Sequence, residues 1–88
     1  MKRIEIEVPR ENREAVHEIA REYGEDVTVS EVEKEDRPFV QFEFIVDSED
    51  IDALATDVKA VKNLERGELT IEVFDEVAYI EKGERRRG

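Results

Sequence analysis

The stretch Phe39-Val40-Gln41-Phe42-Glu43-Phe44-Ile45-Val46 decides the fold. Successive side chains of a β-strand point to opposite faces, so a period of two separates these residues into two sets. One set is wholly apolar: Val40, Phe42, Phe44 and Val46. The other set is mixed: Phe39, Gln41, Glu43 and Ile45. This is the strongest secondary-structure signal in the chain, and it predicts a strand with one deeply buried face.

Three shorter alternating segments predict further strands at residues 3–8, 27–32 and 69–73. The first ends at Pro9, which has no backbone N–H to donate. Val32 is out of phase with Val27 and Val29, which predicts a bulge or a frayed end at Val32. The polar segment 33–38 is expected to be a hairpin loop.

Two segments have the period of an amphipathic helix. Residues 16, 19, 20 and 23 are apolar or aromatic, and Gly24 follows them as an expected left-handed C-terminal cap. The acidic segment 47–50 is expected to open the second helix through capping by Asp47 or Ser48. The buried stripe of that helix is predicted to comprise Ile51, Leu54, Val58 and Val61.

The predicted order is therefore β-α-β-β-α-β. Because crossovers are right-handed, both helices belong on one face of the sheet. We expect an α+β, ferredoxin-like two-layer sandwich with a four-stranded antiparallel sheet in the order 4-1-3-2. Residues 1–82 would form the single domain, residues 77–80 would extend or cover a sheet edge, and residues 83–88 would be a basic flexible tail. The helix-facing side chains would be Ile4, Ile6, Val8, Val27, Val29, Val40, Phe42, Phe44, Val46, Leu69, Ile71 and Val73.

Composition excludes several classes of protein. The 88 residues include no Cys, so there is no disulfide, thiol nucleophile or Cys-ligated metal. The net charge of −11 argues against nucleic acid as a partner. No apolar run approaches the roughly 20 residues that span a bilayer. Abundant Glu and Arg with few Asn and Gln are typical of a thermophile's or a salt-adapted surface.

The open face of the predicted sheet is expected to be polar and acidic. Glu5, Glu7, Glu43 and Glu72 lie there and are weak candidates for oxygen ligands of Ca²⁺ or Mg²⁺. A solvated acidic face that deters aggregation is the favoured interpretation, and no metal or cofactor is expected.

No constellation of catalytic residues is evident. His17 is the only histidine and is expected at the boundary of the core, while Tyr23 and Tyr79 would cover core edges. Arg10 and Asn12 lie near the loop where an acylphosphatase-like enzyme would hold phosphate, but the surrounding sequence does not match. We therefore expect a protein that is not an enzyme.

The consecutive residues Arg85, Arg86 and Arg87 stand out in so acidic a chain. Such a cluster binds an anionic surface or a partner, or marks the cytoplasmic flank of a membrane helix. A tail without a role is an equally weighted interpretation.

The chain resembles the N-terminal soluble domain of the domain of unknown function 389 family. The similar stretches are 4–9, 13–16, 40–44 and 84–88. The resemblance implies a small cytoplasmic domain that precedes a multi-spanning membrane region, and it supplies no catalytic residues. We expect a cytoplasmic regulatory or interaction domain that binds a protein partner or itself by contact. A stand-alone sensor of a small ligand or cation is the alternative.

Overall fold

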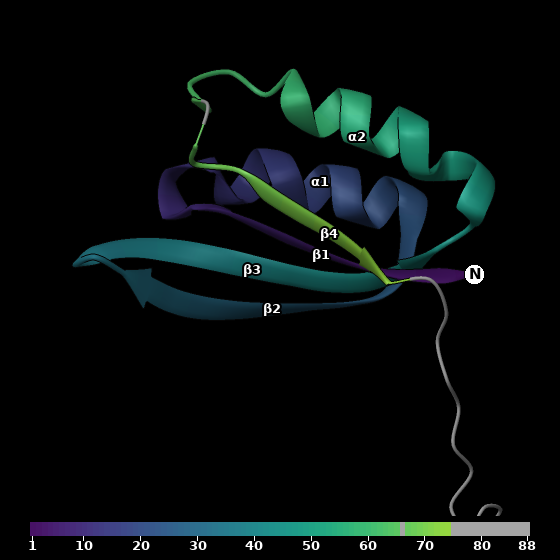
Figure 1. Ribbon diagram of the computed structural model, residues 1–88, viewed down its shortest axis with the longest axis horizontal. Coiled ribbons are helices and arrows are strands. Elements are labelled where there is room, and N and C mark those ends of the chain that lie inside the picture. The colour runs from purple at the N-terminus through teal and green to yellow at the C-terminus, as the bar shows by residue number, and fades with distance from the viewer. Residues whose placement is uncertain (66, 75–88) are drawn as a thin grey trace, which may run out of the picture.

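The computed structural model describes residues 1–65 and 67–74 (Figure 1). In chain order, its elements are β1 (Lys2–Pro9), η1 (Arg10–Asn12), α1 (Arg13–Tyr23), β2 (Gly24–Lys34), β3 (Arg37–Val46), η2 (Ser48–Asp50), α2 (Ile51–Lys59) and β4 (Thr70–Phe74), where η marks a 3₁₀ turn. The strands form one antiparallel sheet in the order β2-β3-β1-β4. Both helices cover the same face of the sheet (Figure 1). The ferredoxin-like α+β sandwich is confirmed, with the predicted strand order.

The core lies between the helices and the two central strands. In the register of β1 with β3, Ile4 is opposite Phe44 and Ile6 is opposite Phe42, and all four side chains are buried. The other fully buried members from the strands and helices are Val8, Val16, Ala20, Val40, Val46, Leu54 and Val58. Valines 27 and 29, Leu69 and Ile71 pack against this core while partly buried.

Val73 does not belong to the core, contrary to the prediction. It lies opposite the buried Ile4, yet 42% of its surface is exposed. The reason is its place near the end of β4, an edge strand of the described sheet.

The hairpin between β2 and β3 is tighter than predicted. Its turn consists of Glu35 and Asp36, whose φ angles are +51° and +66°. Positive φ at both central residues is typical of a type I′ turn, whose twist matches that of the flanking strands. The strands consequently extend through most of the segment expected to be loop.

The predicted bulge at Val32 is wrong, because Val32 pairs regularly with Phe39. The register shift lies between Glu25 and Thr28, where Asp26 has a φ of +59°. Val32 departs from the phase of the earlier valines because it points to the open face of the sheet, beside Phe39. A change of face was thus mistaken for a local irregularity.

Gly24 is not a left-handed cap. Its φ of −117° and ψ of 173° are extended, and it begins β2 directly after α1. Glycine is needed here for space, because a Cβ would lie 2.2 Å from Cδ2 of the buried Phe44. Gly67 is the opposite case, with a φ of +91° and open space where a Cβ would lie.

These two glycines predict different responses to alanine. Gly24→Ala is expected to lower the free energy of unfolding by about 1–3 kcal/mol, because it overpacks the core against Phe44. Gly67→Ala is expected to cost about 1 kcal/mol through backbone strain alone. Urea unfolding of both variants measures the two effects. Adding Phe44→Leu to Gly24→Ala should recover stability if the clash is the cause, and no recovery would contradict it.

The second helix differs from the prediction at both ends. The side chain of Asp47 makes no capping hydrogen bond, and the backbone N–H of Asp50 instead donates to the Asp47 carbonyl oxygen within η2. The helix ends at Lys59, before Val61, the last residue of its predicted buried stripe. Val61 and Leu64 still pack against the core from the connection that follows, so the predicted apolar stripe extends beyond the helix itself.

A hydrogen bond joins the two helices. The hydroxyl of Tyr23, at the end of α1, donates to Oδ2 of Asp57 on α2 at 2.7 Å. This bond raises the pKa of Tyr23 to about 12, with a second contribution from burial. The phenol is therefore neutral, and able to donate, throughout the neutral pH range.

The Tyr23 phenol predicts a loss of stability at alkaline pH. Its pKa is raised in the folded state, so its contribution is complete below its ordinary value of 10 and is lost as the pH rises towards about 12. Tyr79 lies outside the described residues, and a Tyr79→Phe background leaves one tyrosine to titrate by ultraviolet absorbance. Asp57→Asn should move the titration back towards 10, and an unchanged midpoint would show that Asp57 is not the cause.

Candidate interaction face of the sheet

The helices leave the other face of the sheet uncovered by any other described element, and the strand register arranges its side chains in rows. One row across the sheet is Glu72, Glu5, Glu43 and Thr28, and the next is Thr70, Glu7, Gln41 and Ser30. The structure therefore brings the four predicted carboxylates to one face. They do not form one cluster, because cations of the same face hold three of them.

Arg3 is the centre of the first ionic group. Its Nη1 donates to Glu5 at 2.9 Å and also to Glu43. The hydrogen bond to Glu43 is the main cause of the raised pKa of Arg3. The guanidinium lies 4.1 Å from the centre of the Phe74 ring, a cation–π contact. Arg3 therefore joins β1, β3 and β4 on the open face.

Lys34 is the second cation of this face. Its Nζ lies 2.7 Å from Oε1 of Glu7 and 4.9 Å from the centre of the Phe39 ring. Glu72 is the exception among the four carboxylates, since it has no ion pair or hydrogen bond within residues 1–65 and 67–74. In that same part of the chain, no group of three or more acidic or histidine side chains is placed to hold a metal ion.

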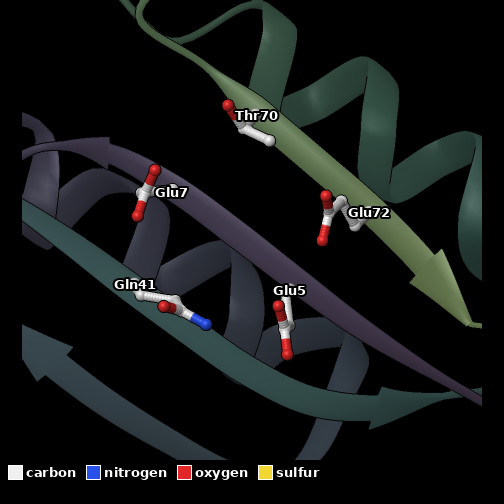
Figure 2. A pocket seen from close by; sticks show the side chains of 5 residues that line it. All are labelled: Glu5, Glu7, Gln41, Thr70 and Glu72. Carbon is white, nitrogen blue, oxygen red and sulfur yellow. The ribbon is translucent and has the colours of Figure 1, made fainter.

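A hollow of about 210 Å³ lies between the central and β4 strands on this face. Its lining residues come from three strands: Glu5 and Glu7 from β1, Gln41 from β3, and Thr70 and Glu72 from β4 (Figure 2). Glu43, which accepts a hydrogen bond from Arg3, is not among them. The hollow therefore combines three carboxylates with an amide and a hydroxyl, all of which can accept hydrogen bonds.

Apolar side chains flank the acidic rows at both ends, an arrangement that was not predicted from the sequence. Phe39 is only 7% exposed on this face and lies opposite both Val32 and Pro9. At the other end, Phe74 lies opposite Arg3, which also pairs with Ile45. The face is thus acidic at its centre and apolar at its ends.

Two residues of this face that were not proposed as site residues, Arg3 and Phe39, can be placed on it from the alternation of side chains along their strands. Arg3 is in phase with Glu5 and Glu7, and Phe39 is in phase with Gln41. The hairpin turn determines which residues of β2 reach this face, and that turn was predicted too long. Lys34 could therefore not be assigned to the face from the pattern alone.

The other sequence candidates lie elsewhere or outside the described residues. His17 is half-buried on α1, and its ring centre lies 5.4 Å from that of Phe42, as expected for the boundary of the core. Arg10 is exposed in η1, whereas Asn12 of the same turn is buried. Residues 85–87 lie outside the part of the chain that the structure describes.

Comparison with known proteins supports the fold alone. No protein-family model and no curated protein matches the chain. Among solved structures, it is similar to a DUF3240 family protein from Shewanella baltica OS155, with a TM-score of 0.66 and 11% identity over 88% of this chain and 91% of that one. It is also similar to LarC2, the C-terminal domain of a cyclometallase involved in the synthesis of the NPN cofactor of lactate racemase. That similarity has a TM-score of 0.55 and 14% identity, over 84% of this chain and 55% of the other.

Within the described residues, no helix is long and apolar enough to cross a membrane.

Proposed function

We propose that this protein is a cytoplasmic interaction domain that works by contact rather than by catalysis, and that it binds a basic segment of a partner protein on its open sheet face. The observation that carries the proposal is the hollow lined by Glu5, Glu7 and Glu72 between apolar ends of the same face. An extended peptide with basic residues is complementary in charge to such a surface.

The charge of the hollow favours a cation over a second acidic surface. Glu5 and Glu7 are less than a quarter exposed, so their interactions are screened less by water than those of a fully solvated carboxylate. Glu72 has no partner within the described residues and is available to a new cation. Packing this face against its own copy would bring like charges together, which supports a basic partner over self-association.

A hexa-arginine peptide serves as the test ligand, with hexa-citrulline as its uncharged control of similar shape. Saturable binding of hexa-arginine is expected, with NMR shifts centred on β1 and β4, and none for hexa-citrulline. Glu72→Gln should weaken binding by about fivefold or more at low salt, since one close charge pair is lost.

Glu22→Gln is the matched control, because Glu22 is exposed on α1 and the substitution removes the same charge. If both variants weaken binding equally, the peptide senses only the net charge and the proposed face is wrong. Shifts spread evenly over the helices would lead to the same conclusion.

A second candidate role, at a membrane surface, is supported by the sequence run Arg85–Arg87 and by the resemblance to the domain of unknown function 389 family. Basic residues beside an anionic leaflet contribute about 1 kcal/mol each, enough to hold the end of the chain there. The acidic domain itself would be repelled from the same leaflet and would present its sheet face to a partner.

Co-sedimentation with vesicles of phosphatidylserine and phosphatidylcholine tests this role. The chain is expected to bind these vesicles weakly at low salt, and replacement of residues 85–87 by alanine is expected to abolish binding. Vesicles of phosphatidylcholine alone are the control. Equal sedimentation of the two proteins would remove the arginine run as the reason for membrane contact.

A further inference from the structure

Asn12 is the one polar or charged residue that is buried within the described part of the chain, with 5% of its surface exposed. Its Nδ2 donates to the backbone carbonyl oxygen of Lys62 at 3.3 Å. Its Oδ1 is buried and accepts no hydrogen bond. A buried acceptor without a donor is destabilising, so this atom requires an explanation.

Helix capping does not explain it. Asn12 directly precedes α1, where an Asn side chain commonly accepts a hydrogen bond from the first turn. No such side-chain bond is formed. The oxygen therefore has no donor within the described residues.

Asn12 lines a hollow of about 460 Å³ at the end of the domain, away from the sheet-face hollow and sharing no residue with it. The walls come from η1, the start of β3 and residues 63, 65 and 68 between α2 and β4. The other lining residues are Glu11, Arg37, Asn63, Glu65 and Glu68. This volume is in the range of small-molecule sites, about 300–1,000 Å³.

The charges of this hollow are unbalanced. Arg37 donates to Glu68 at 2.8 Å and to Glu11 at 3.4 Å. The backbone N–H of Glu65 also donates to Glu68, and these two donors lower the pKa of Glu68 and keep it ionised. The Glu65 carboxylate has no partner among the described residues. Among the described lining residues, Arg37 thus pairs with two carboxylates and Glu65 adds a third, so the excess charge is negative.

The chemistry of a ligand follows from these two features. The two unpartnered groups described above, Asn12 Oδ1 and the Glu65 carboxylate, are acceptors, so a ligand that binds both must donate, and the negative excess repels phosphates and carboxylates. Within residues 1–65 and 67–74, no group of three or more acidic or histidine side chains is placed to hold a metal ion. We infer that this hollow binds a small organic cation through a primary ammonium group, which donates to Asn12 Oδ1 and to the Glu65 carboxylate. Binding requires a small rotation of the Asn12 side chain, since its oxygen has almost no exposed surface.

Titration of the full chain with n-butylammonium, followed by ¹⁵N NMR, tests the inference. Saturable shifts are expected at the Asn12 side-chain amide and at the backbone amides of Asn63 and Glu65. Tetramethylammonium has the same charge and no N–H donor, and it should produce no such shifts. Equal shifts with both cations, or shifts that never saturate, would overturn the proposed site.

Substitutions locate the site independently. Glu65→Gln and Asn12→Leu should each weaken n-butylammonium binding by about tenfold, the effect of losing a hydrogen bond to a charged group. Glu49→Gln removes the same charge at η2, outside the hollow, and should leave binding unchanged. If Asn12→Leu fails to fold, Glu65→Gln alone tests the site, because Glu65 is exposed and its substitution is not expected to disturb folding. Equal weakening of n-butylammonium binding by the Glu49 and Glu65 variants would contradict the inference. Neither result bears on hexa-arginine binding at the sheet face, because the two hollows share no residue.

Discussion

The pairing of β1 with β3 is the constraint on which the rest of the structure depends. Eight residues of β1 pair in register with β3, from Lys2 opposite Val46 to Pro9 opposite Phe39. Alternate pairs enter the core or the open face, so a slip of one residue would exchange the two sets. The same register that buries Ile6 against Phe42 also places Glu5 beside Glu43. The core and the acidic face are therefore two results of one alignment.

The elements of the fold were predictable because their signals are periodic and strong. β3 has an apolar side chain at every second position, and burial of that set leaves only one productive orientation. The features that were missed depend on contacts distant in sequence. Gly24 was assigned to a cap by local pattern, whereas its lack of a side chain is required by Phe44, twenty residues away. The exposure of Val73 follows from the position of β4 at the edge of the sheet, and no local pattern contains that information.

The candidate site was predictable in the same limited sense. Alternation placed Glu5, Glu7, Glu43 and Glu72 on one face, and the structure does so. It could not reveal that Arg3 would hold two of these carboxylates, because the choice of partner depends on side-chain geometry across neighbouring strands. The same alternation placed Phe39 on this face, whereas Phe74 follows the last residue of the predicted strand 69–73 and was not assigned to the face.

The arginines of this protein matter more for arrangement than for stability. Arg3 and Arg37 each bind two carboxylates, a role that suits the planar guanidinium with its several donors. Exposed ion pairs contribute only about 0–1 kcal/mol each, so these pairs are not what holds the fold together. Their effect is to fix some carboxylates and leave others free. Arg3 binds Glu5 and Glu43 while Glu72 stays unpaired, and Arg37 binds Glu68 while Glu65 stays unpaired, within the described residues. In each hollow an unpaired carboxylate thus lies beside a carboxylate that an arginine holds, and it is to this unpaired carboxylate that each proposed cationic ligand would bind.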